Sequence, residues 1–166
     1  MESDSQPVVA VTVLNETDAP IDVDSWADLV RNALAAEGVV APAETNVVFV
    51  DADTIAELNS EHMGKDGPTD VLSFPIDDEW DDAFVMPGEI RFVGDIVLCP
   101  EVAERNASEH AGTTADEIAL LLIHGTLHLL GHDHGEPEER ALMWATEQRL
   151  MAELWRPLSR NPWQDS

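Results

Sequence analysis

The hydrophobic positions in the first third of the chain predict two strands with a helix between them. Val8–Leu14 and Thr45–Val50 are short runs rich in β-branched residues, which is typical of strands. Between them, apolar residues recur at helical spacing over residues 26–34. Ser25 and Asp28 form a capping pair at the start of this segment, so we expect an amphipathic helix there.

The middle of the chain predicts shorter elements. Asp53 is placed to cap a helix of about ten residues that ends near Gly64. Val71–Phe74 and Asp95–Cys99 have the composition of two further strands. The stretch between these strands, residues 77–92, is acidic and rich in turn residues, so it predicts a long loop or an irregular hairpin.

The most apolar segment lies in the last third of the chain. Thr114 and Glu117 form a capping-box pair ahead of an apolar run over residues 118–130, and Gly131 follows as a natural end to a helix. A helix that is apolar on all sides is buried in the middle of its domain. We therefore expect this segment to be the central helix of the protein.

The full order of elements predicts an α+β fold. Pro100 favours the start of a helix that runs to about Ala111, and Pro137 favours the start of a last helix that stops before Pro157. We expect a small mixed sheet of about four strands, packed with helices around the central buried helix. No repeat or linker divides the sequence, so residues 1–166 are expected to form a single domain with its own core.

The charge of the chain is strongly negative. Eight Lys and Arg residues stand against 34 Asp and Glu residues, giving a net charge of −26 spread along the whole sequence. Such self-repulsion destabilises a compact state, and it is screened in strong salt, where the Debye length falls to about 3 Å at 1 M. We predict adaptation to a salt-rich interior; a merely acidic protein is the alternative. The charge by itself argues against a nucleic-acid-binding surface, which is normally basic.

Cysteine content and hydropathy indicate the cell compartment. Cys99 is the single cysteine and has no internal disulfide partner, so it is expected to be a small core residue in a reducing environment. No apolar run is long enough to cross a bilayer, and the N-terminal residues lack the pattern of a signal peptide. We expect a cytoplasmic protein without a membrane partner.

Four of the six histidines fall within residues 124–134. His124 and His128 are one helical turn apart and share a helix face, with Cβ atoms roughly 6 Å apart. Gly131 can adopt the left-handed conformation that turns the chain back, which would bring His134 toward the pair. Polar groups buried without partners cost about 1–3 kcal/mol each, so the pair is better explained as metal ligands than as ordinary core residues.

Three imidazoles around a zinc-like ion would leave a fourth position for water, whose pKa would fall to about 7. Imidazole nitrogen also suits iron, nickel or copper, and zinc is the assignment that we favour. Asp133 is expected to orient an imidazole, and His132 to be a solvated loop residue. The histidine spacing is shared with metzincin proteases, but Gly125 stands where those enzymes carry their general-base glutamate, which disfavours a protease.

Three sequence blocks resemble those of the YbeY endoribonucleases, a family of bacterial rRNA maturation factors. The run HGTLHLLGHDH at residues 124–134 is similar to the family signature H-G-x-L-H-L-x-G-[Y]-D-H. The run GKDGPTDVLSFP at residues 64–75 resembles the block P-T-[DN]-V-L-S-F-P, and GDIVLC at residues 94–99 resembles G-D-I-x-I-C. The blocks occur in the family's order, and the resemblance covers nearly the whole chain.

This resemblance implies a zincin-like fold and one Zn²⁺ ion held by His124, His128 and His134, which act in catalysis through the metal. It implies metal-assisted cleavage of single-stranded RNA, in which metal-bound water takes part and the ion stabilises phosphoryl charge. It also implies a role in maturing the 3′ end of 16S rRNA and in ribosome quality control, with the small ribosomal subunit as partner. Lys65 and Ser73 are further candidate catalytic residues, as substrate contacts at a cleft beside the metal.

Two departures from the family pattern leave alternatives open. Met63 stands where some members carry an arginine that is important for activity, and Lys65 is the nearby substitute by charge. His132 stands where tyrosine is usual. A ribosome-assembly factor with little nuclease activity, or a metallohydrolase of another substrate, therefore remains an alternative.

His62 and His110 are expected to be solvated helix residues without a role. The arginines could form a basic path only if the fold gathers them: Arg91, Arg105, Arg140, Arg149, Arg156 and Arg160.

Overall fold

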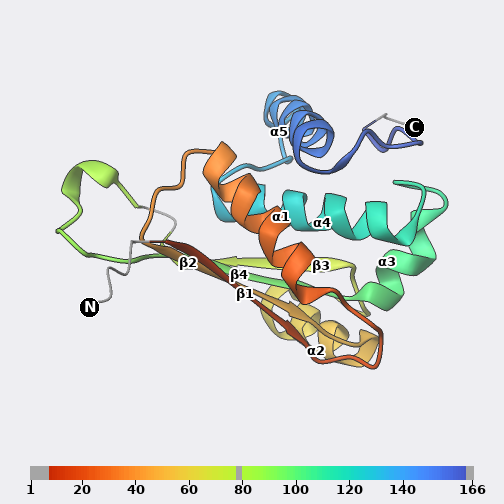
Figure 1. Cartoon of the computed structure of the whole chain (residues 1–166). Coiled ribbons are helices and arrows are strands. Elements are labelled where there is room, and N and C mark those ends of the chain that lie inside the picture. Colours follow the sequence, from red (N-terminus) through yellow and green to blue (C-terminus); the bar gives the residue numbers. More distant parts are fainter. Residues whose placement is uncertain (1–7, 78–79, 164–166) are drawn as a thin grey trace.

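The structure is a computed structural model that describes residues 8–77 and 80–163, and it has the predicted α+β architecture (Figure 1). The elements follow one another in this order: β1 (Val9–Asn15), α1 (Val23–Ala36), β2 (Ala43–Phe49), α2 (Ala52–Met63), β3 (Val71–Pro75), the 3₁₀ turn η1 (Asp82–Phe84), β4 (Arg91–Leu98), α3 (Pro100–Ala107), α4 (Thr114–Leu129), α5 (Pro137–Leu150) and the π-helical turn η2 (Met151–Trp155).

The four strands form one mixed sheet in the order β1-β2-β4-β3. β1 pairs with β2, and β2 with β4, in parallel, whereas β3 runs antiparallel to β4. Residues 76–90 therefore join an antiparallel pair, which confirms the irregular hairpin. β4 begins at Arg91 rather than at Asp95, because a register shift opposite Glu44 and Thr45 lets the strand continue past Gly94.

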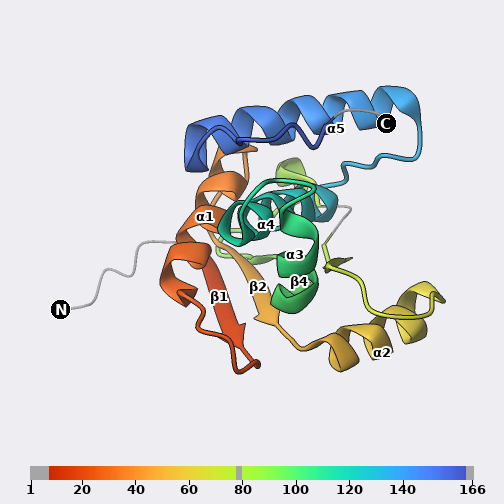
Figure 2. The same ribbon diagram turned by 90° about the vertical axis from the view of Figure 1, so that its right-hand side faces the viewer.

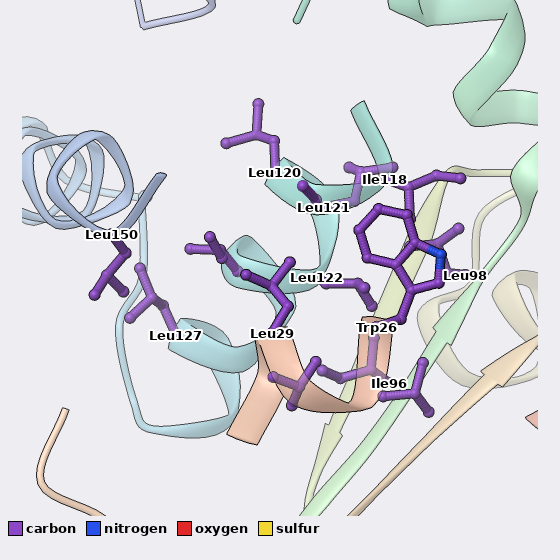
Figure 3. Close-up of a cluster of buried hydrophobic side chains, with 14 of the residues drawn as sticks. Trp26, Leu29, Ile96, Leu98, Ile118, Leu120, Leu121, Leu122, Leu127 and Leu150 are labelled. Atoms are coloured by element: carbon purple, nitrogen blue, oxygen red, sulfur yellow. The ribbon is translucent and has the colours of Figure 1, made fainter. Parts of the chain in front are cut away.

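Helices cover both faces of the sheet. α1 and α4 lie on one face, α2 lies on the other, and α5 crosses α4 on the side away from the sheet (Figures 1 and 2). The apolar residues of α4 pack between Trp26 and Leu29 of α1, Ile96 and Leu98 of β4, and Leu150 of α5 (Figure 3). The predicted central buried helix is thus confirmed. Within residues 8–77 and 80–163, even this most apolar helix falls short of what a membrane-spanning segment requires.

Two helices begin earlier than the sequence pattern predicts. The cap of α1 is Asp22, whose carboxylate accepts from the N–H of Ser25 at 3.3 Å, so Ser25 and Asp28 are not its caps. The cap of α2 is Asp51 rather than Asp53. A capping side chain lies outside the helix and accepts from an N–H of the first turn.

The predicted capping box of α4 is also wrong. Thr113, not Thr114, caps the helix, and Glu117 is buried and bonded to the ring of His110, with 2.8 Å between His110 Nδ1 and Glu117 Oε2. His110 lies in the turn beyond Ala107, where α3 ends, so it is not a solvated helix residue. The hydrogen bond to Glu117 raises the pKa of His110 against the opposing effect of burial.

The segment after α5 is fastened to the start of α4. Trp155 Nε1 and Arg156 Nε both donate to Asp116 Oδ1, at 2.9 and 2.7 Å. Burial raises the pKa of Asp116, but these donors outweigh burial, so that the pKa of this carboxyl lies below its usual range. The ring of Trp155 also stacks on Trp26 of α1, with 5.2 Å between centroids. These contacts fix the path of the chain beyond α5.

Candidate active site

The C-terminal end of α4 brings the three predicted ligands together. His124 and His128 lie one turn apart, and their Nε2 atoms are 3.0 Å from each other. Gly131 follows the helix with a φ of +98°, a left-handed conformation that turns the chain back so that His134 joins the pair. One nitrogen from each of the three rings lies within 4.8 Å of the other two.

The backbone carbonyl of His132 fixes the protonation of His128. His128 Nδ1 lies 2.9 Å from this oxygen, and a carbonyl can only accept, so the proton is on Nδ1. In the neutral ring, Nε2 then carries a lone pair that faces His124. Burial lowers the pKa of His128, and the neighbouring His124 and His134 lower it further. A metal ligand must be neutral imidazole, and this environment favours that form.

A buried carboxylate from α5 holds His124. Glu147 Oε2 lies 2.5 Å from His124 Nδ1, and Glu147 is only 3% exposed. Its other oxygen, Oε1, accepts from the indole N–H of Trp163 at 2.9 Å. A carboxylate on the second nitrogen of a metal-binding histidine fixes the tautomer and orientation of the ring and raises its basicity.

Sequence reasoning missed Glu147 and assigned the orienting role to Asp133, which is wrong. The Asp133 carboxylate accepts instead from the backbone N–H of His134, at 2.7 Å. A signal for Glu147 exists in the sequence, because Met143, Glu147 and Leu150 have helical spacing and are all buried. A carboxylate within an apolar helical stripe is buried and needs a hydrogen-bond donor. For Glu147 this donor is His124.

His132 is more buried than expected for a loop residue. Its side chain is 20% exposed, and Nε2 lies 3.5 Å from Glu37 Oε1 at the end of α1. Glu37 also accepts from Arg149 of α5, at 2.8 Å. His132 therefore attaches the loop that carries His134 to the end of α1, and Arg149 links the same glutamate to α5.

The histidine cluster lies in a cleft of about 640 Å³. Both further candidates lie here: Lys65 from the loop after α2 and Ser73 from β3. The Ser73 hydroxyl donates to the backbone carbonyl of Gly125 at 3.2 Å, which attaches β3 to α4. The residues that line the cleft include the predicted Thr69–Ser73 block, and in full they are Asn59, Met63, Lys65, Thr69, Asp70, Val71, Leu72, Ser73, Pro75, His124, His128, Gly131, His132, Asp133 and His134.

Close packing explains the glycine after the first histidine. A Cβ atom at Gly125 would lie 3.1 Å from Ser73 Oγ and 3.2 Å from Ile96 Cγ2. Both distances are shorter than ordinary van der Waals contact, so the Ser73 and Ile96 side chains would have to move by a few tenths of an ångström to admit a side chain here. The position that holds the general base in metzincins is therefore tightly packed against the sheet in this protein.

The cleft carries little positive charge. Among its described lining residues, Lys65 is the one cationic side chain, and Asp70 and Asp133 are acidic. The fold does not gather the arginines here; Arg149 pairs with Glu37, and Arg156 pairs with Asp116. The basic path that a nucleic acid would favour is absent from the described walls of this cleft.

The donor set suits a metal ion. Imidazole nitrogens from His124, His128 and His134 converge, and two of the rings have their Nδ1 atoms held by a carboxylate and a carbonyl. Three histidines in an accessible cleft would leave a further coordination position open on a bound metal ion. The cluster could therefore hold a metal ion.

Fold and site together define an α+β protein with a three-histidine cluster that could hold a metal in an open cleft. The family model described as Endoribonuclease YbeY matches residues 12–155, and the chain belongs to this family. It is similar to proteins named Endoribonuclease YbeY from two organisms. The Salinispora tropica protein is 47% identical over 155 residues, which cover 89% of this chain and 97% of that protein. The Thermobifida fusca protein is 42% identical over 144 residues, covering 87% and 93%.

A solved structure is also similar to this fold. The solution structure of a Thermotoga maritima protein superposes with a TM-score of 0.56 at 30% sequence identity. The match covers 94% of this chain and 96% of that one. The similarity thus extends over nearly the whole of both proteins.

Proposed function

We propose that this protein is a metal-dependent endoribonuclease that cuts single-stranded RNA and binds one Zn²⁺ ion on His124, His128 and His134. The observation that carries the proposal is the convergence of three imidazoles in an open cleft, with Glu147 and the His132 carbonyl holding two of the rings. The relatives' name, Endoribonuclease YbeY, supports RNA as the substrate. The small ribosomal subunit as partner, 16S rRNA 3′-end maturation, ribosome quality control and a cytoplasmic location belong to the same proposal.

The residues of the cleft have distinct roles in this function. A bound zinc ion would supply Lewis-acid stabilisation of phosphoryl charge and lower the pKa of a water ligand. Glu147 accepts a hydrogen bond from His124 Nδ1 and thereby keeps Nε2 directed at the cleft. Lys65 contributes the positive charge that contacts an RNA phosphate. The Ser73 hydroxyl donates a hydrogen bond to the Gly125 carbonyl. This bond positions β3, and with it the cleft wall formed by Thr69 and Asp70, beside the histidine cluster.

The test is cleavage of a single-stranded RNA by highly purified protein, with and without zinc, at low and high salt. We expect cleavage that requires zinc and is lost in His128→Ala. His62→Ala is the matched control, because His62 is an exposed histidine outside the cluster and should leave cleavage unchanged. Equal cleavage by His128→Ala and the unmodified protein would refute the proposal.

The weak positive charge of the cleft favours a second candidate, a ribosome-assembly factor with little nuclease activity. Met63 and a single lysine leave the cleft poorly suited to hold the phosphates of an extended RNA. This candidate predicts that His128→Ala still associates with the small ribosomal subunit, and that the zinc-loaded protein cuts no RNA at any salt concentration. Cosedimentation with ribosomal subunits, measured beside the cleavage assay, separates the two.

A further inference from the structure

A second cavity, of about 240 Å³, lies next to the histidine cluster. It shares Asp70, Val71 and His124 with the larger cleft, so the two cavities meet at one wall of the histidine site. Holding a metal does not require this cavity, because the three ligands converge in the larger cleft. Its lining is Asp70, Val71, His110, Leu120, Leu121, His124, Trp144, Glu147, Pro162 and Trp163.

The cavity is lined by two tryptophans from different parts of the chain. Trp144 comes from α5 and Trp163 from the segment beyond η2, and both are half-buried. Trp163 is fixed by the hydrogen bond from its indole N–H to Glu147, and both oxygens of that buried carboxylate are occupied. The volume lies below the roughly 300–1,000 Å³ that is typical of pockets for drug-sized ligands. The cavity therefore suits one small, flat, aromatic group.

Positive charge accompanies the aromatic wall. The Arg140 guanidinium lies 5.2 Å from the centroid of the Trp144 ring. Arg140 does not line the cavity itself, but it places a cation next to the aromatic wall, a combination that single-stranded nucleic-acid sites use. Asp70 and His110 add polar groups to the lining. Asp70 Oδ1 accepts from the N–H of Val71, and His110 Nδ1 is held by Glu117, so Asp70 Oδ2 and His110 Nε2 are the atoms that can pair with the edge of a base.

We propose that this cavity is a nucleobase-binding subsite. It would bind one unstacked base of an RNA strand, next to the phosphate that lies at the histidine cluster. That the base belongs to the RNA substrate rests on the function proposed above. Stacking on indole is tolerant of base identity, so the subsite would position the strand without setting a strict sequence. It also gives an acidic protein a way to hold RNA that depends less on charge than phosphate contacts do.

Binding can be tested without cleavage. Adenosine 5′-monophosphate is added to metal-free protein, and the indole N–H signals are followed by ¹H–¹⁵N NMR. We expect the signals of Trp144 and Trp163 to shift while that of Trp26, which is buried in the core, does not. Ribose 5-phosphate, which lacks the base, should shift neither signal. Unchanged Trp144 and Trp163 signals at millimolar nucleotide would overturn the subsite.

Substitution of Trp144 supplies the matched variants. Trp144→Ala should weaken nucleotide binding about 5- to 150-fold, the equivalent of the 1–3 kcal/mol that one base–aromatic stack contributes. Trp144→Phe keeps a stacking surface and should restore most of the affinity. The NMR spectrum of each variant verifies that it is folded. Equal affinity in Trp144→Ala and the unmodified protein would overturn the proposal.

The cleavage assay then connects the subsite to the reaction. Trp144→Ala should raise KM for RNA by a similar factor while kcat changes less, because Trp144 is not one of the three histidines and lines only the second cavity. If nucleotide shifts both indole signals but the protein cuts no RNA, the proposed subsite is supported and the proposed nuclease function is refuted. RNA cleavage with no nucleotide effect on the indoles would uphold the nuclease and refute the subsite.

Discussion

Replacing Glu147 by Gln tests how much the buried carboxylate contributes to metal binding. The carboxylate accepts from two donors, His124 Nδ1 at 2.5 Å and Trp163 Nε1 at 2.9 Å. Glutamine has nearly the same size but only one acceptor oxygen, so its NH₂ group would face one of the two donors. Either His124 or Trp163 then loses the acceptor of its hydrogen bond.

The size of the effect follows from these two bonds. Removing a partner that orients a metal-binding histidine typically lowers metal affinity 10- to 100-fold, which is about 1.4–2.7 kcal/mol. We expect Glu147→Gln to weaken zinc binding by this factor. Trp163→Phe, which removes only the donor to Glu147, should weaken zinc binding less. The metal-free protein should also lose about 1–3 kcal/mol of unfolding free energy in Glu147→Gln, because one buried donor is unsatisfied.

The assay is competition for zinc between metal-stripped protein and a chromophoric chelator of known affinity, with urea unfolding in parallel. Glu153→Gln is the matched control, because this exposed acid follows α5 and should leave both quantities unchanged. A folded Glu147→Gln protein that binds zinc as tightly as the unmodified protein would show that the carboxylate does not orient His124.

Three further predictions concern charge. Met63→Arg adds a cation to the wall of the cleft, so RNA should bind more tightly, and the slope of log affinity against log salt should steepen by about 0.7; an unchanged slope would place Met63 away from the phosphates. Because Glu117 raises the pKa of His110 above its ordinary value of 6.5, this pair stabilises the fold fully below about pH 6.5 and loses its effect as the pH rises through the folded-state pKa. His110→Gln should therefore lower the unfolding free energy of the metal-free protein most at acidic pH, and a difference from the unmodified protein that is constant between about pH 5.5 and about pH 8.5 would contradict this. With a net charge of −26, the melting temperature should rise between low salt and about 1 M salt, and equal values would refute the predicted adaptation to salt.

The order of elements and the core were predictable because local patterns determine them. The apolar run of α4 has no polar face, so it had to be buried wherever the other elements lay. Cap positions were less predictable, because neighbouring Asp and Ser side chains compete for the same N–H groups and only the backbone conformation decides between them. The start of β4 was missed because an irregular pairing next to Gly94 breaks the alternation that marks a strand.

The candidate site was predictable only where its parts are close in sequence. His124 and His128 share a helix face by spacing alone, and Gly131 marks the turn toward His134. The partner of His124 was not predictable in this way, because Glu147 reaches it across a helix crossing 23 residues away in sequence. Asp133 was assigned this role through its proximity in sequence, but its carboxylate is occupied by the adjacent backbone.

The chain of hydrogen bonds from Trp163 through Glu147 to His124 also has a consequence during synthesis. Glu147 is added 23 residues after His124, and Trp163 a further 16 residues later. At the usual rate of about 5–20 residues per second, His124 exists for about 1–5 s before its carboxylate partner has been translated. The orientation of the His124 ring is therefore among the last features of the site to form on a nascent chain.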